Sequence, residues 1–421
     1  MQGHIAEGLY VEYKSAFPLA VKVAHSVASF ANTHGGWYIV GIKTDENNEP
    51  QSIEGFDLAL NPNPKEWLRD VIKSNVDPVP HVESKLVRLS TGKVVLVAYV
   101  PESLETPHIT RDGRIYRRNA EGSDPVPEIN RYVVDQLYER GKRFKEYLRR
   151  FCRSEFAYSK AQEKQGWFLA YIIPYPLGSF EAPDFTKQKL DELRKHFAGT
   201  STFFGILSMG IPFQIMQNSL DSVTLRQTKR EQLAYLTLTV RIFRNGAAKF
   251  LVPLQYIDPL APRSEYASSA AFQELVSHLS RSETQLFRII DGYGLFTAFM
   301  VLTAKHIEFL RKSDWAESNL LVAYELQETW RHIMFFDSEE FTEQLQTHGV
   351  PVCHESRGRI PATLEKDPMM ITLDERMESL AGDFRLVSDY FGIFRETFLG
   401  CIRRGWVDYL RRIQEAQPAI D

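Results

Sequence analysis

Cysteine is scarce in this sequence of 421 residues. The three cysteines, Cys152, Cys353 and Cys401, lie far apart, and no two of them form a CxxC pair. This spacing argues against a disulfide framework and against a zinc module built on paired cysteines. Cysteine usage therefore predicts a reducing, intracellular compartment.

A strong net charge is also absent. The 50 Lys and Arg residues nearly balance the 54 Asp and Glu residues, which leaves a formal net charge of −4 at pH 7. No global electrostatic field attracts a polyanion, so any basic binding surface must be local. A GxxxxGK[ST] loop is missing as well, which argues against a nucleotide site of the P-loop type.

The sequence shows neither a signal peptide nor a membrane span. Its N-terminus lacks a basic segment followed by an apolar one, as a signal peptide would require. The most apolar later run, 286–304, is interrupted by Arg288 and Asp291, so a pair of buried helices is expected there. The composition is that of a globular protein with roughly two or three domains. We expect a cytoplasmic protein without membrane contact.

The most informative stretch lies near the N-terminus and begins with two glutamates, Glu7 and Glu12. Residues 9–14 alternate between apolar and polar side chains as a strand does. Strand parity would place the two carboxylates on opposite faces unless the backbone breaks between them. Gly8 is the residue that can supply such a break. Spacing alone therefore leaves their convergence open.

A helix and a buried strand follow. Pro18 opens a helical pattern that ends in Asn32, Thr33, His34, Gly35 and Gly36, residue types that tolerate left-handed backbone conformations. Residues 37–42 form a short continuous apolar run that predicts a central strand. Helices and strands continue without regular βαβ alternation to about residue 135. The fold class predicted for this part is α+β.

The remainder divides into three regions by composition. Residues 136–160 carry a run of cations with interleaved aromatics, which includes Arg140, Lys142 and Arg143 and predicts a basic linker helix. Residues 161–262 are strand-rich and are expected to act in recognition or as a second lobe. Residues 263–421 are mostly helical in pattern, with one helix predicted over 316–334. We expect this last region to form a bundle for assembly or partner sensing.

Several short motifs together resemble the Schlafen AlbA_2 domain over residues 5–135. They are Glu12-Tyr13-Lys14, Phe30-Ala31-Asn32-Thr33-x-Gly35-Gly36, Gly41-Ile42, Val100-Pro101-x-Ser103, Pro107-His108 and Tyr116-x-Arg118. The family is also described as ATP-binding or DNA-binding. Only one copy is visible, whereas animal Schlafens build a cleft from two lobes. The resemblance therefore implies either a homo-oligomer or a degenerate second lobe.

The resemblance implies a metal-dependent endoribonuclease. In Schlafen enzymes that cut tRNA and rRNA, three carboxylates form the metal site, and Glu7 and Glu12 match the spacing of the first two. The third would be Asp45, with Glu46 as the fallback, because Lys43 and Thr44 stand where the family places its acid. These side chains would hold Mg²⁺ or Mn²⁺, which prefer carboxylate oxygens. The structural alternative pairs Glu12 with Lys14 or an arginine and leaves Asp45 as a turn residue.

Further residues are candidates for phosphate contact. Asn32, Thr33, Gly35 and Gly36 would bring backbone close to a phosphate, although helix capping and tight strand entry need the same residues. Lys14, Arg117 and Arg118 would contact or neutralise phosphate. Arg140, Lys142 and Arg143 would track a nucleic-acid backbone. A surface charge or an ion-pair partner is the alternative for each cation.

Two functions therefore compete. The first is a metal-dependent nuclease that acts on RNA, tRNA-like or otherwise structured, or on DNA, with a role in antiviral defence that rests on family analogy alone. The second is a non-catalytic regulator that binds nucleic acid or nucleotide and assembles through its helical C-terminal region. The uncertain third carboxylate favours the second.

Overall fold

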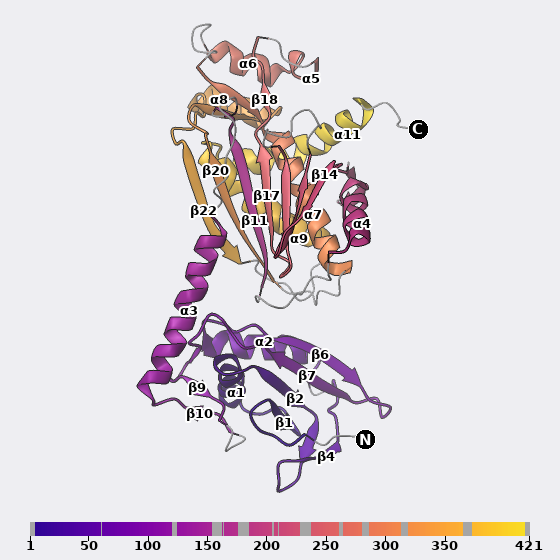
Figure 1. The fold of residues 1–421 in the computed structure, drawn as a ribbon, viewed down its shortest axis with the longest axis vertical. Coiled ribbons are helices and arrows are strands. Elements are labelled where there is room, and N and C mark those ends of the chain that lie inside the picture. Colours follow the sequence, from indigo (N-terminus) through magenta and orange to yellow (C-terminus); the bar gives the residue numbers. More distant parts are fainter. Residues whose placement is uncertain are drawn as a thin grey trace. The chain divides into compact units, whose positions relative to one another are not determined.

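The computed structural model divides the chain into two compact units, residues 1–153 and residues 154–421. It describes residues 5–59, 61–119, 124–153, 162, 164–175, 185–203, 206–208, 210–227, 237–260, 264–279, 286–312, 319–364 and 373–416. Each unit has its own apolar core. Both units mix helices with sheets (Figure 1), which confirms the predicted α+β class. Within the described ranges no helix is both long and apolar enough to cross a lipid bilayer.

The N-terminal unit is built on a four-stranded sheet of order β1-β2-β7-β6. Strands β1 and β2 are parallel and are joined by helix α1, whereas β7 runs antiparallel to both of its neighbours. The elements of this unit are β1 Val11–Lys14, α1 Ala20–Asn32, β2 Gly36–Val40, β3 Ile42–Thr44, β4 Pro50–Ile53, α2 Pro64–Asn75, β5 Val76–Asp77, β6 Glu83–Arg88, β7 Val94–Val100, β8 Ile109–Thr110, β9 Tyr116–Arg117, β10 Val126–Pro127 and α3 Arg131–Phe151.

Helices α1 and α2 supply the core of this unit. Val23, Val27 and Phe30 recur at helical spacing on α1 and are fully buried, as an amphipathic helix on a sheet requires. They pack against Tyr38 and Leu96 on the inner face of the sheet. The sheet thus fixes β1, α1 and β2 relative to one another, and these elements carry Glu12, Lys14, Asn32 and Gly36 of the predicted site.

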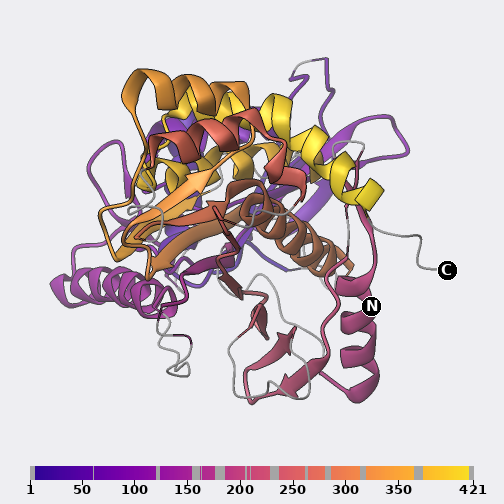
Figure 2. The same ribbon diagram turned by 90° about the horizontal axis from the view of Figure 1, so that it is seen from above.

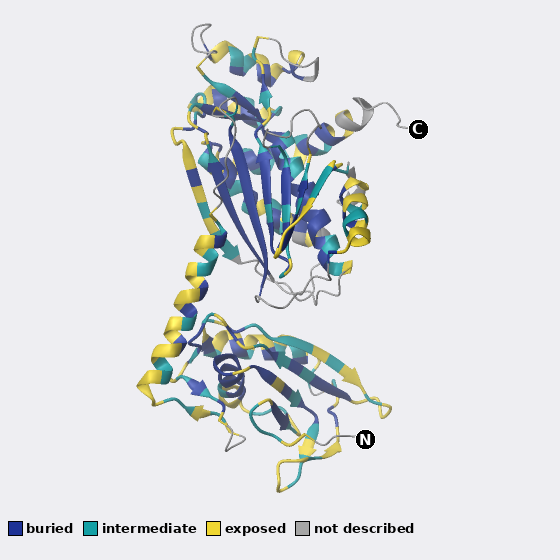
Figure 3. Cartoon of the chain, in the orientation of Figure 1, coloured by how far each residue is buried: buried dark blue, intermediate teal, exposed yellow. Residues whose placement is uncertain are grey.

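Helix α3 docks on the N-terminal unit through its first half. The Thr106 hydroxyl donates a hydrogen bond to the carbonyl oxygen of Leu137, at 2.7 Å. Gly141 allows close approach, because a Cβ atom there would stand 2.2 Å from the carbonyl oxygen of Thr106. The Asn130 side chain caps the start of the helix by accepting from the amide of Tyr132. Exposed residues run along much of α3 (Figure 3).

The C-terminal unit is organised on a seven-stranded antiparallel sheet of order β14-β15-β16-β17-β11-β20-β22. Helix α4 lies at one margin of this unit in both ribbon views (Figures 1 and 2). The strands are β11 Trp167–Tyr175, β12 Ser201–Phe203, β13 Ile206–Ser208, β14 Ile215–Asn218, β15 Ser222–Arg226, β16 Thr239–Phe243, β17 Ala248–Pro253, β18 Tyr256–Ile257, β19 Arg288–Asp291, β20 Asn319–Gln327, β21 His332–Phe335 and β22 Arg357–Leu364. The helices are α4 Lys187–Ala198, α5 Ser264–Ala267, α6 Ala270–His278, α7 Gly292–Lys312, α8 Glu339–His348, α9 Leu373–Tyr390, α10 Arg395–Gly400, a π-helical turn at Cys401–Gly405 and α11 Trp406–Ala416.

Three predictions for the C-terminal unit differ from the structure. The pair of buried helices expected over 286–304 is instead the strand β19 followed by the single helix α7. The helix predicted over 316–334 is instead the strands β20 and β21. Helices do predominate after residue 264, but β20 pairs along its whole length with β11. Residues 161–262 and 263–421, predicted as separate regions, therefore share one sheet and one core. The long-range pairing satisfies the backbone of an apolar run that fits a buried helix or a buried strand equally well.

Candidate functional site

Glu12 lies on β1 and is turned inward, with 2% of the residue exposed. Both of its carboxylate oxygens have partners. Oε1 accepts a hydrogen bond from the Ser26 hydroxyl and lies 2.9 Å from the Lys14 ammonium nitrogen. Oε2 accepts from the Arg118 guanidinium at 2.9 Å. A buried charge needs such partners because desolvation is costly, so this geometry matches the structural alternative for Glu12.

Arg118 is the buried partner that closes this cluster. Its side chain is 0% exposed, and its guanidinium lies 4.3 Å from the ring centre of Phe30. Burial lowers the pKa of Arg118, while the charge and hydrogen bond of Glu12 oppose that shift. Arg118 therefore contacts Glu12 inside the unit, and its side chain does not reach solvent to make the predicted phosphate contact.

Glu7 and Glu12 do converge, in spite of their strand parity. Residues 7–10 form a bend before β1 begins at Val11, which removes the parity constraint. The Glu7 Oε1 atom accepts from the backbone amide of Tyr13 at 2.6 Å and lies 3.6 Å from the Lys14 nitrogen. Burial raises the pKa of Glu7, against the lowering effects of Lys14 and the Tyr13 amide. One lysine thus bridges two carboxylates.

Asp45, the third predicted carboxylate, stabilises the turn in which it lies. Asp45 follows β3, and its Oδ1 atom accepts from the backbone amides of Asn47 and Glu49 at 2.8 and 2.9 Å. The turn lies beside Glu7, whose amide donates to the carbonyl oxygen of Asn48. Glu46, the fallback, is exposed. Across the described residues, no group of three or more His, Cys, Asp or Glu side chains is arranged to hold a metal ion. The predicted three-carboxylate site is therefore not assembled in this conformation.

Asn32 and Thr33 hold the end of α1 against two loops. Asn32 is 1% exposed; its side-chain nitrogen donates to the carbonyl oxygens of His108 and Tyr116, and its oxygen accepts from the His108 amide. The Thr33 hydroxyl donates to Ser29 and accepts from the Arg118 amide. The side-chain hydrogen-bonding groups of both residues are thus used inside the unit, and the close approach of this backbone to a phosphate stays a prediction.

Gly35 and Gly36 are required by close packing. Gly35 has a positive φ of 74°, and a Cβ atom there would lie 2.7 Å from the amide nitrogen of Glu102 and from the carbonyl oxygen of Val100. A Cβ atom on Gly36 would lie 2.3 Å from the Phe30 ring. Neither position admits a side chain, so the strand entry explains both glycines without a ligand.

The remaining predicted cations differ in how far they are engaged. Arg117 pairs with Glu128, and Arg140 pairs with Glu102, each at 2.9 Å. Lys142 makes a looser surface pair with Glu139 at 3.7 Å. In the described part of the chain no ion pair involves the exposed side chains of Arg143, Lys145, Arg149 and Arg150. The sequence run located this basic helix, but only the structure separates paired from unpaired cations.

A pair of aromatic rings, one exposed and one half-buried, was not predicted from the sequence. The rings of Trp37 and Tyr99 lie 4.8 Å apart on neighbouring strands β2 and β7, and Trp37 is 44% exposed. The apolar run 37–42 predicted a central strand, which would be buried on both faces, whereas Trp37 on this strand is exposed. The signal that could have found it is the alternation of β7, in which Tyr99 has the parity opposite to the buried Ala98 and Val100.

Two solved structures are each similar to a part of this chain. The DIP2311 protein from Corynebacterium diphtheriae is 30% identical over 28% of this chain and 25% of its own, with a TM-score of 0.20. The N-terminal domain of a RecG-related protein from Nitrosomonas europaea is 23% identical over 30% of this chain and 89% of its own, with a TM-score of 0.23. The first alignment thus spans about a quarter of the Corynebacterium protein.

No curated protein matches the chain. The family model described as Schlafen, AlbA_2 matches residues 7–127. This range contains the sheet, the Glu12 cluster and the glycine turn, and it ends just before α3. Residues 7–127 therefore form a Schlafen AlbA_2 domain, as the sequence resemblance predicts.

Proposed function

We propose that the N-terminal unit binds nucleic acid, with RNA preferred to DNA, through the exposed face of α3. The observation that carries this proposal is the set of cations on that face. Lys142, Lys145 and Arg149 follow one another at intervals of three and four residues, which places them on one side of the helix. Arg143 and Arg150 lie beside them, and Glu139 and Glu146 are the acids on this face.

Such a row suits a phosphate backbone. Residues 142–149 cover roughly 10 Å of helix axis at 1.5 Å per residue. Apart from Lys142, which pairs with Glu139, these cations make no ion pair with the described residues. Their binding to a phosphate therefore does not first break an ion pair. The chain has a net charge of −4, so a polyanion must bind to a local basic surface, and this face of α3 is such a surface. The preference for RNA rests on the Schlafen family match.

The exposed Trp37 ring and the half-buried Tyr99 ring beside it support unpaired bases as part of the substrate. Stacking on aromatic side chains is how proteins hold single-stranded nucleic acid with little sequence preference. The pair lies on the sheet face opposite to α1, within the matched domain. We therefore propose RNA with single-stranded segments as the preferred ligand.

The test is an anisotropy titration of the full chain with labelled single-stranded RNA, single-stranded DNA and duplex RNA, in EDTA. Replacing Lys145, Arg149 and Arg150 together with glutamine should weaken RNA binding by about tenfold or more. Arg131→Gln is the matched control, since Arg131 is exposed on the same helix but pairs with Asp135. Equal affinity of the triple variant and the wild type would contradict the proposal.

Metal-dependent cleavage is the second candidate, because Glu7 and Glu12 converge on Lys14. Mg²⁺ is often held by one or two carboxylates together with substrate phosphates. Incubating RNA and DNA with the protein and Mn²⁺ or EDTA tests this idea. Glu7→Gln is the variant of choice, since its amide oxygen can still accept from the Tyr13 amide. Cleavage that persists in EDTA or in this variant would remove the candidate.

A further inference from the structure

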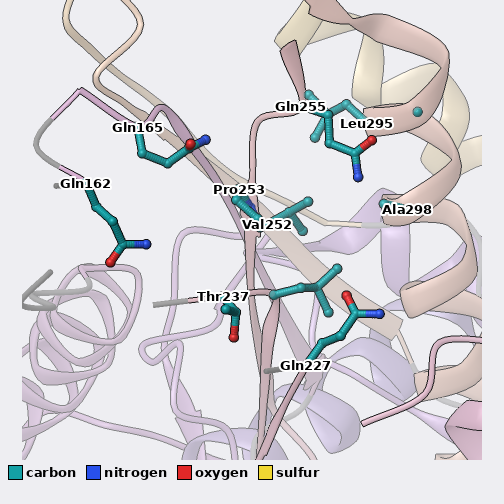
Figure 4. Close-up of a pocket in the computed structure, with 11 residues that line it drawn as sticks. Gln162, Gln165, Gln227, Thr237, Val252, Pro253, Gln255, Leu295 and Ala298 are labelled. Carbon is teal, nitrogen blue, oxygen red and sulfur yellow. The ribbon is translucent and has the colours of Figure 1, made fainter. Parts of the chain in front are cut away.

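A cavity in the C-terminal unit has a chemistry unlike that of the basic helix. Its volume is about 290 Å³, close to the lower end of the roughly 300–1,000 Å³ typical of ligand pockets. It lies among the ends of β16 and β17, the first turns of α7 and the residues before β11 (Figure 4). Its lining residues are Gln162, Gln165, Gln227, Thr237, Leu238, Val252, Pro253, Gln255, Gly294, Leu295 and Ala298.

None of the lining residues that the structure describes has a charged side chain. Four glutamines and one threonine supply the polar groups, and aliphatic residues supply most of the rest. The N-terminus of α7 is also unfavourable for an anion. The Asp291 carboxylate already accepts a hydrogen bond from the amide of Gly294 there, at 2.8 Å. A charged ligand would lose hydration here without gaining a counter-charge. The cavity therefore favours a neutral ligand.

Some of the polar groups already have partners and some do not. Gln165 is part of the wall, since its side-chain nitrogen donates to the carbonyl oxygens of Gly166 and Leu254. The hydroxyl oxygen of Thr237 is buried and has no hydrogen-bond partner among the described residues. Gln227 and Gln255 are exposed at the mouth, and their amides approach the cavity from opposite sides in Figure 4. A buried hydroxyl left unpaired costs free energy, which a ligand can recover.

We infer that this cavity binds a nucleobase, either free or as an uncharged nucleoside. A glutamine amide presents a donor and an acceptor side by side, which matches the edge of a base. The apolar side chains of Leu238, Val252 and Leu295 offer surfaces for the faces of the ring. A 5′-phosphate would find no cation among the described lining residues. The inference does not depend on nucleic-acid binding by α3, because every lining residue belongs to the C-terminal unit.

Calorimetric titration of the full chain with adenosine, guanosine, cytidine and uridine, and with their 5′-monophosphates, tests the inference. At least one nucleoside should bind, and it should bind about tenfold or more tightly than its monophosphate. Absence of binding by all four nucleosides at millimolar concentration would overturn the inference. Equal binding of nucleoside and monophosphate would overturn it too.

Thr237→Val separates a ligand-binding hydroxyl from a structural one. This substitution should lower the affinity for the nucleoside by about fivefold, while the melting temperature of the free protein stays the same or rises. A lower melting temperature with unchanged affinity would contradict the assignment. Gln227→Leu should weaken binding to a similar extent, and Gln188→Leu is the control, since Gln188 is exposed on α4 away from the cavity. The α3 triple variant should bind the nucleoside as the wild type does.

Discussion

Arg118 and Arg149 belong to the same unit and carry the same charge, yet they lie in opposite surroundings. Arg118 is fully buried against Glu12 and Phe30, whereas Arg149 is exposed on α3 with no ion pair in the described part of the chain. The first side chain holds β1 to the segment after β9. The second is free to meet a polyanion. Residue type alone therefore does not distinguish a buried, structural cation from an exposed one.

The same contrast between buried and exposed residues separates the motif residues of the Schlafen AlbA_2 domain from the cations of α3. Those that carry the family resemblance, among them Glu12, Asn32, Gly36 and Arg118, are buried and explained by internal contacts. The basic face of α3 begins after the matched range of 7–127 ends. A motif that identifies a family can thus report how its domain packs, while the nucleic-acid surface that we propose lies on the next element.

The largest effect is expected from removing the buried cation. Arg118→Met should leave Glu12 as an uncompensated buried charge and cost about 3–5 kcal/mol of unfolding free energy. Hydrogen exchange in peptides from residues 7–127 would measure this loss within the full chain. Arg117→Met is the matched control, since its partially exposed pair with Glu128 should be worth about 1 kcal/mol or less. Equal losses for the two variants would erase the distinction between buried and exposed cations.

Acid should weaken the interior of the N-terminal unit through His108. Burial lowers the pKa of His108 to about 4, from an ordinary value of 6.5. Because the folded pKa is depressed, the stabilisation is present above pH 6.5 and is lost as the pH falls toward 4. The loss should approach 3 kcal/mol, roughly.

Urea unfolding of wild type and His108→Gln between pH 7 and pH 4 measures this loss, by hydrogen exchange or by probes in each unit. The variant should be less stable at pH 7 but should vary less with pH. His306 in the C-terminal unit, whose pKa burial also lowers to about 4, is the matched control. His306→Gln should flatten only the C-terminal profile. A steep N-terminal profile in His108→Gln would show that other groups govern the acid response.

A substitution of Asn32 tests whether the turn at residues 32–36 has a structural role. Asn32→Ala removes three hydrogen bonds to the backbones of His108 and Tyr116 and should cost about 2 kcal/mol of unfolding free energy. RNA affinity of the folded fraction should stay unchanged. Asn47→Ala, in the exposed turn after β3, is the control for both measurements. A stable Asn32→Ala protein that has lost RNA binding would instead assign Asn32 to the ligand.

The smallest effect on stability, within about 0.5 kcal/mol, is expected on α3. Arg149→Gln should leave the melting temperature unchanged and reduce RNA affinity by a few-fold. The slope of log affinity against log salt should fall by about 0.7 for each phosphate of single-stranded RNA that the variant no longer neutralises. Titrations at several salt concentrations give this slope. An unchanged slope would place the phosphate-binding cations elsewhere on the protein.

The sequence by itself determined the family of residues 7–127, the α+β class, the β1-α1-β2 order and the position of the basic helix. Each of these follows from local patterns: helical or strand periodicity, turn residues and a run of cations. For Glu12 the sequence left two alternatives open, a metal ligand or an ion-pair partner of Lys14 or an arginine. The structure matches the second.

Only the tertiary structure decided which side chains meet. The pair of Glu12 with Arg118 joins residues 106 positions apart, and Asn32 reaches across 76 and 84 positions. The strand β20 was predicted as a helix because its apolar run fits both, and its partners β11 and β22 are supplied by distant segments. Burial and pairing depend on such long-range contacts, and these assign Arg118 to the core and leave Arg149 exposed on α3.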